Sequence, residues 1–163
     1  MLKRVTFLFA ALATLATARS AAAQTINWPG GNCVTAHGSL AAGATRWSGD
    51  FGTESTTATL SAYCPVETSG VDDDVSSASV VFLDRHPTEN ACCTLTSQFF
   101  QTDGTVWGQQ SGPMCSSGAG TQMQGDSVDV DFGTLGRNMQ FQCSVPRRTT
   151  LGRSAIFNYE IVR

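Results

Sequence analysis

Lysine is almost absent from this chain, and the one that is present helps to divide the sequence. Lys3 precedes an apolar run over residues 5–16 and the small residues Ala-Ala-Ala at 21–23. A positive start, a short apolar core and an A-x-A site are typical of a secretory signal peptide. We therefore expect residues 1–23 to be removed and residues 24–163 to form one working domain.

The expected mature chain has neither an excess of cations nor a long apolar run. Removing 23 of the 163 residues leaves 140, with seven arginines against thirteen acidic residues and a net charge of −6. This balance argues against a basic nucleic-acid-binding surface, and the apolar run of the leader is too short for a transmembrane helix. The sequence predicts a secreted protein, extracellular or periplasmic, with no transmembrane segment and no nucleic-acid partner.

Helical periodicity is missing as well. Runs rich in Val, Thr, Phe and Tyr alternate instead with Gly, Pro and Asp-Gly turn signals, which is typical of short strands. The predicted strands are 34–40, 44–48, 56–65, 78–84, 92–101, 105–109, 127–132, 139–145 and 154–162. Their number and spacing predict an all-β fold, an antiparallel, jelly-roll-like β-sandwich stabilised by disulfides.

Two of these runs carry more detail. The run 79–83 has apolar residues on both faces, at positions 80–83, as in a central strand that is covered on both sides. The last run places Ala155, Phe157, Tyr159 and Ile161 on one face by simple alternation. So apolar a terminus should be tied into a sheet, and its removal should unfold the domain.

All six cysteines lie in the expected mature chain, and an even set in an exported protein indicates a disulfide framework. Zinc is the alternative, but no closely spaced ligand pair such as C-x-x-C is present. Alternation turns Cys93 and Cys143 inward and Cys92 outward. We predict a bridge between Cys93 and Cys143 through the core, and one from Cys92 to Cys115 in a Gly/Ser-rich stretch. The third pair is then Cys33–Cys64.

Several short motifs stand in order between Cys33 and the C-terminus. They are YCPV at 63–66, VVFLDRH at 80–86, ACCTL at 91–95, DG at 103–104, FQCSVP at 141–146 and SAIFNYE at 154–160. In this order they resemble a family of small secreted proteins predicted in myxobacteria and related Gram-negative bacteria. The resemblance implies no established activity, no catalytic residues and four cysteines, matching Cys33, Cys64, Cys93 and Cys143, with Cys92 and Cys115 as additions.

His86 is the candidate for catalysis, because it follows a buried strand in a loop. A hydrolase would need a nucleophile and an orienting acid beside it. The alternative is a loop histidine next to a local ion pair of Asp84 and Arg85.

Calcium is the candidate metal. Asp72, Asp73 and Asp74 could wrap an ion in a loop, and Asp126, Asp129 and Asp131 form a second acidic group. A charged outer strand face is the alternative for that second group.

Tryptophans could bind carbohydrate if they are exposed on one face. Trp107 follows an Asp-Gly turn and Trp28 adjoins Pro29, so we consider both as binding residues. The alternative is that Trp47 and Trp107 anchor the core, as large aromatic residues usually do. The sequence thus favours an exported, non-enzymatic structural or binding protein. It does not identify the partner, for which a carbohydrate or a cell-surface component is the candidate. The alternatives are a carbohydrate-binding module, with or without calcium, and a hydrolase that uses His86.

Overall fold

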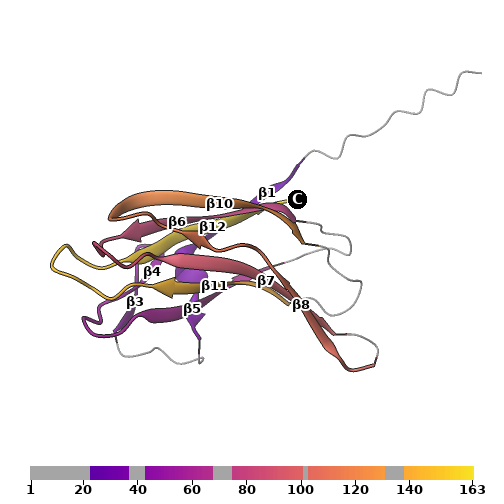
Figure 1. The fold of residues 1–163 in the computed structure, drawn as a ribbon, viewed down its shortest axis with the longest axis horizontal. Coiled ribbons are helices and arrows are strands. Elements are labelled where there is room, and N and C mark those ends of the chain that lie inside the picture. Colours follow the sequence, from indigo (N-terminus) through magenta and orange to yellow (C-terminus); the bar gives the residue numbers. More distant parts are fainter. Residues whose placement is uncertain (1–22, 37–42, 68–74, 101–102, 131–137) are drawn as a thin grey trace, which may run out of the picture.

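Two antiparallel sheets of six strands each pack face to face as a β-sandwich in the computed structural model of the chain (Figure 1). The structure describes residues 23–36, 43–67, 75–100, 103–130 and 138–163. The all-β prediction and the antiparallel sandwich are therefore confirmed. The expected leader lies outside the described residues except for Ala23.

Sheet A has the strand order β10-β6-β12-β4-β3, with β1 also paired to β12; β10, β6 and β12 lie uppermost in Figure 1. Its strands are β1 (Thr25–Pro29), β3 (Ala44–Trp47), β4 (Asp50–Thr53), β6 (Val75–Asp84), β10 (Gly120–Val130) and β12 (Ala155–Val162). The C-terminal strand β12 is hydrogen-bonded to β6 on one side and to β1 and β4 on the other, so the apolar terminus is tied into the sheet as predicted.

Sheet B has the order β2-β5-β11-β7-β8, with β9 also paired to β7. Its strands are β2 (Val34–Thr35), β5 (Leu60–Val66), β7 (Cys92–Phe100), β8 (Val106–Gln110), β9 (Met114–Cys115) and β11 (Asn138–Val145). A short 3₁₀ helix, η1 (Gly30–Asn32), joins β1 to β2. Within the described ranges no helix is long and apolar enough to cross a membrane.

The core lies between the two sheets and follows from alternation along the strands. On β11, Met139, Phe141, Cys143 and Val145 are buried, whereas the residues between them are exposed or half-buried. From the opposite sheet Tyr159 packs edge-on against Phe141, with 5.4 Å between the ring centroids. The Tyr159 hydroxyl also donates a hydrogen bond of 2.8 Å to the carbonyl of Pro65, which links sheet A to sheet B.

All six cysteines form disulfides: Cys33–Cys64, Cys92–Cys115 and Cys93–Cys143. These are the three predicted pairs: alternation gave the directions of Cys92, Cys93 and Cys143, and Cys33–Cys64 was the pair that remained. The route of one bridge differs from the prediction, because Cys93 and Cys143 lie opposite each other on the neighbouring strands β7 and β11, and so the bond runs along sheet B and not across the core. Two bridges join adjacent strands of sheet B, and the third joins Cys33, directly before β2, to β5; the Cα separations are 4.0 or 4.1 Å.

Alternation on β12 was predicted wrongly at one position. The register against β6 shifts between Ile156 and Asn158, so Phe157 is an extra, bulged residue. As a result Ile156 and Tyr159 both point into the core with no exposed surface, while Phe157 is 39% exposed. A bulge changes which residues face inward, and periodicity along a single strand does not reveal it.

Three strands and the true extent of a fourth were also missed. β1, β4 and β9 were not predicted, and the strand expected at 127–132 begins at Gly120 and ends at Val130. β10 is polar in sequence, yet it pairs with the apolar strand β6 from Gly120 to Val130 at one edge of sheet A. Pairing with β6 therefore determines a strand that composition alone does not.

Candidate binding groove

An uncharged groove crosses the outer face of sheet B. The inward side chains of β5, β11 and β7 form the core, so the residues between them point to the outside. The groove has a volume of about 480 Å³. Among the side chains that line it are those of Ser61, Tyr63, Thr94, Gln110, Gln142 and Ser144.

A second hollow of about 190 Å³ continues the groove along β7 and β8. Both hollows are lined by Gln110 and Gln142, and the second adds Thr96, Gln98 and Gln109. None of the described residues that line either hollow carries a charge. Besides Ala36, Ala62, Gly108 and the two disulfide-bonded cysteines Cys92 and Cys143, the lining consists of amides, hydroxyls and one phenol ring. These polar groups donate and accept hydrogen bonds without bringing a charge to the surface.

The disulfides hold the strands beneath this groove. Cys33–Cys64 joins the residue directly before β2 to β5, Cys93–Cys143 joins β7 to β11, and Cys92–Cys115 joins β7 to β9. Cys92 and Cys143 themselves line the groove. Because these links fix neighbouring strands, the outward side chains are held in position before any ligand arrives.

Trp28 is not a surface residue, contrary to one of the candidate assignments. It is 8% exposed and stacks on Tyr159, with ring centroids 5.6 Å apart and planes 17° from parallel. The cause is the pairing of β1 with β12, which sets Trp28 directly opposite Tyr159. At the adjoining turn a side chain on Gly30 would lie 1.9 Å from the carbonyl oxygen of Ile156, so only glycine allows this approach.

Trp47 and Trp107 are both exposed, so neither is the core anchor that was considered. Trp47 is 68% exposed and Trp107 is 58% exposed. Trp47 belongs to β3 in sheet A, where the Arg153 guanidinium lies 5.6 Å from its ring centroid, and Trp107 belongs to β8 in sheet B. Figure 1 places β3 and β8 toward opposite ends of the sandwich, so the two rings do not form one aromatic platform.

His86 is buried, at 5% exposure, and both ring nitrogens face its own loop. Nδ1 accepts a hydrogen bond of 2.8 Å from the backbone N–H of Glu89, and Nε2 lies 3.5 Å from the Glu89 carboxylate. That carboxylate is in turn 3.2 Å from Arg147. No hydroxyl in the described part of the chain hydrogen-bonds to His86, so the geometry supports a loop-closing role and offers no nucleophile.

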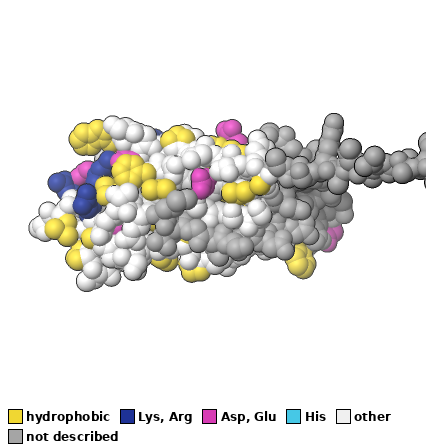
Figure 2. Space-filling model, turned by 90° about the horizontal axis from the view of Figure 1, so that it is seen from above, with side chains coloured by type: hydrophobic (Ala, Val, Ile, Leu, Met, Phe, Trp, Pro, Cys, Tyr) yellow, Lys and Arg dark blue, Asp and Glu magenta, His cyan; other side chains and the backbone are white. Residues whose placement is uncertain are grey.

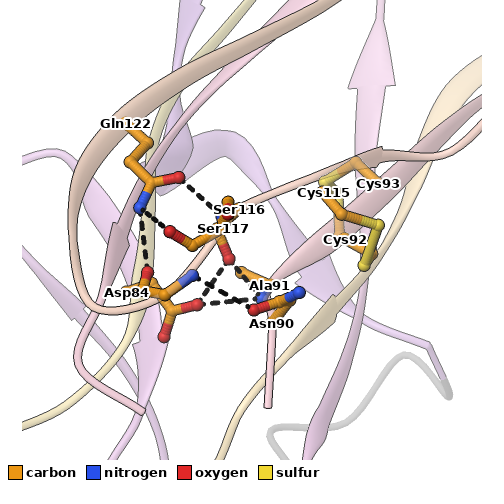
Figure 3. The surroundings of a disulfide bond; sticks show 11 residues. Asp84, Asn90, Ala91, Cys92, Cys93, Cys115, Ser116, Ser117 and Gln122 are labelled. Carbon is orange, nitrogen blue, oxygen red and sulfur yellow. Dashed lines mark hydrogen bonds between the residues drawn. A yellow bond between two sulfur atoms is a disulfide. The ribbon is translucent and has the colours of Figure 1, made fainter. Parts of the chain in front are cut away.

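Asp84 does not pair with Arg85, which corrects the expected local ion pair. Its carboxylate is fully buried and accepts hydrogen bonds from the hydroxyls of Ser116 and Ser154 and from the backbone N–H groups of His86 and Ala91. Figure 3 shows the part of this network that Asp84, Ala91 and Ser116 form, beside the Cys92–Cys115 disulfide. Asp84 ends β6 in sheet A and Ser116 follows β9 in sheet B, so the network joins the two sheets.

The charged groups gather elsewhere. Seen from the side of sheet A, the visible arginines lie at one end of the molecule beside acidic and hydrophobic side chains, while single acidic side chains lie farther along the face (Figure 2). Arg153 and Asp50 form a largely buried ion pair of 2.6 Å, and Arg148 reaches Glu54 at 2.6 Å. These arginines are therefore matched by carboxylates.

Metal binding has no support within the described ranges, where no group of three or more His, Cys, Asp or Glu side chains could hold an ion. Asp72, Asp73 and Asp74, like Asp131, lie outside the described residues, so the calcium prediction there stays a prediction.

Two groups have shifted pKa values. Burial raises the pKa of Tyr159, and hydrogen bonds from Thr105 lower the pKa of Asp103.

Comparison with known proteins adds little to this geometry. No protein-family model matches the chain, and no curated protein matches it. The chain is similar to a solved structure described as "xylan-binding module CBM15", with a TM-score of 0.48 and 17% identity over 86% of this chain and 97% of that chain. A likeness of this degree decides neither fold nor ligand. The resemblance to small secreted bacterial proteins stays a prediction.

Proposed function

We propose that the chain is a secreted, non-enzymatic binding protein whose groove on sheet B takes a neutral carbohydrate chain. The observation that carries this proposal is the uncharged lining shared by the two hollows. A polysaccharide without acidic groups presents many hydroxyls and no charge, so amides and hydroxyls match it better than ionic side chains do.

Gln142 and Gln110 are the central residues of the proposed site, because both line the two hollows. Each amide offers two N–H donors and one acceptor, which suits neighbouring hydroxyls of a sugar ring. Tyr63 is the aromatic ring in the groove and would stack against one sugar face. The Trp28 assignment is not part of this proposal, because that ring is in the core.

Export fits the same proposal. The three disulfides belong to an oxidising compartment, and the sequence predicts a cleaved leader. Sheet B, cross-linked along its strands, would keep the groove in shape outside the cell. His86 does not enter the proposal, since both of its ring nitrogens are engaged within its own loop.

The test is binding to soluble neutral polysaccharides, measured by calorimetry, with uronic-acid polymers as the charged comparison. Gln142→Ala should weaken binding by about tenfold, since one net hydrogen bond and part of its desolvated surroundings are lost. Tyr63→Ala should weaken it by a similar factor. Gln24→Ala is the matched control, because Gln24 is exposed beside sheet A and lies outside both hollows.

Two results would contradict the proposal. One is equal or tighter binding to the acidic polymers, which a neutral lining does not explain. The other is unchanged affinity in Gln142→Ala and Tyr63→Ala while the fold is intact by circular dichroism.

A further inference from the structure

The sheet edges differ in how well they are protected against another strand. In sheet A, β10 has a bulge between Ser127 and Val130 and contains Asp126 and Asp129, and β3 is four residues long and contains Arg46. In sheet B, β2 and β9 have only two residues each. Short length, bulges and charge are the features that keep sheet edges from pairing between molecules.

β8 has none of these features. Its five residues contain no charge and no proline, all are exposed, and its register against β7 is regular. No described strand pairs with its other side. Val106 is 56% exposed and Trp107 is 58% exposed, so apolar surface lies directly at this open edge.

The hydrogen-bond pattern shows which groups β8 presents. The N–H of Ser111 donates to the carbonyl of Leu95 at 2.9 Å, and these two residues continue the register in which Gln110 lies opposite Thr96. In an antiparallel ladder hydrogen-bonded pairs alternate with non-hydrogen-bonded pairs. Trp107 and Gln109 therefore direct their backbone groups to β7, whereas Val106, Gly108 and Gln110 direct theirs outward.

We propose that the chain forms a symmetric dimer in which β8 pairs antiparallel with β8 of a second copy. With Gly108 on the two-fold axis, Gly108 lies opposite itself and Val106 lies opposite Gln110 of the other copy. This register makes a hydrogen-bonded pair of every outward-facing residue in the strand. A shift by one residue would place Val106, Gly108 and Gln110 opposite residues whose backbone groups face β7.

The side chains of β8 are compatible with a second copy of the chain as the strand that pairs with this edge. An acidic protein is repelled by itself, and β8 is an edge that brings no like charges together. In this register Trp107 lies diagonal to Trp107 of the second copy, a separation that aromatic side chains can span. The strands β10, β3, β2 and β9 are protected by charge, a bulge or short length, and β1, which pairs with β12, ends in Pro29. Pairing through β8 therefore ends at two copies and does not continue as a fibre.

The test uses two double variants of the oxidised, secreted chain. Val106→Lys with Gln110→Lys places like charges opposite each other twice across the two-fold axis, and should weaken self-association by about tenfold. Val106→Lys with Gln110→Glu places opposite charges there, and should restore dimers. Sedimentation velocity over a range of concentrations measures the association, and thermal unfolding verifies that both variants fold equally well.

The wild type should sediment at twice the monomer mass as its concentration rises. A wild type that stays monomeric throughout would overturn the proposal, including the case in which β8 instead captures a foreign extended peptide. Equal association of the two double variants would also overturn it, because that result excludes this register. No sugar enters the assay, so its outcome is independent of the proposed binding function.

Discussion

The two sheets of the sandwich are stabilised by different means. Sheet B contains all three disulfides, and its outer face bears the groove. Sheet A has no disulfide, and Phe51, Phe82 and Ile156 on its strands have no exposed surface. The covalent links thus lie beneath the candidate binding surface, while the other layer depends on packing and hydrogen bonds.

No disulfide joins one sheet to the other. The contacts between them include the Tyr159–Pro65 hydrogen bond and the network around Asp84. The second contact depends on a disulfide indirectly, because Cys115 is bonded to Cys92 and Ser116 is the next residue. Cross-links within sheet B therefore help to place the groups that bind sheet A.

The largest expected effect is the loss of a disulfide. Cys93→Ala with Cys143→Ala removes the bridge with the longest sequence separation, 50 residues, without leaving an unpaired thiol. The chain-entropy relation gives a loss of about 4 kcal/mol in the free energy of unfolding for a loop of that length. Urea denaturation measures it.

The matched comparison is Cys33→Ala with Cys64→Ala, also between buried residues, where the separation is 31. The same relation gives about 3.7 kcal/mol for that loop. Losses below about 1 kcal/mol for both double variants would show that packing, and not covalent linkage, stabilises sheet B.

The second-largest expected effect concerns the hydrogen-bond network around Asp84, which links sheet A to sheet B. In Asp84 each carboxylate oxygen accepts one backbone N–H, from His86 on one side and from Ala91 on the other. Asparagine has one side-chain oxygen and one N–H₂ group. In Asp84→Asn the N–H₂ group therefore faces one of these two backbone N–H donors, which loses its acceptor. We expect a loss of about 2–3 kcal/mol in the free energy of unfolding, measured by urea denaturation.

Ser154→Ala is the smaller comparison, because the carboxylate keeps its other donors. The variant also removes the hydroxyl that accepts a hydrogen bond of 2.9 Å from the backbone N–H of Arg85. About 1 kcal/mol is expected there. If Asp84→Asn proved as mild as Ser154→Ala, the network would not be an important link between sheet A and sheet B.

Sequence patterns that depend on neighbours along the chain predicted much of sheet B. Alternation on β11 and at the start of β7 turned Cys143 and Cys93 inward and Cys92 outward, as observed. Because a cysteine's direction follows from strand parity, the pairing was within reach of the sequence. The strand containing Trp107 was also predicted within a residue, although the ring was considered for both surface and core.

Features that depend on contacts between residues distant in the sequence could not be predicted from the sequence alone. Trp28 is buried because β1 pairs with β12, some 130 residues later, as the direct contact of Trp28 with Tyr159 at separation 131 shows. Phe157 is exposed because of a bulge against β6. The groove itself unites β5, β11, β7 and β8, and Gln142 gave no signal beyond an outward position in a strand.

The smallest expected effect lies where no disulfide acts, at the turn between β7 and β8. Asp103 accepts hydrogen bonds from the Thr105 hydroxyl at 2.7 Å and from the Thr105 backbone N–H at 2.9 Å. Both favour the charged carboxylate and lower the pKa of Asp103 below its ordinary value of 3.8. The stabilisation is therefore present above that value and is lost as the pH falls through the lower, folded-state pKa.

Carboxyl-carbon NMR of Asp103 measures this directly. Thr105→Val should move the titration midpoint upward, toward the ordinary value, whereas Thr105→Ser keeps a hydroxyl and should leave it low. A midpoint that does not respond to Thr105→Val would assign the shift to another cause. Because Asp103 is fully exposed, solvent weakens this contribution, and global unfolding should hardly change with either variant. A shifted titration midpoint with unchanged global unfolding would show that hydrogen bonds at the Asp103 turn act only locally. The neighbouring strands of sheet B, in contrast, are stabilised by disulfides.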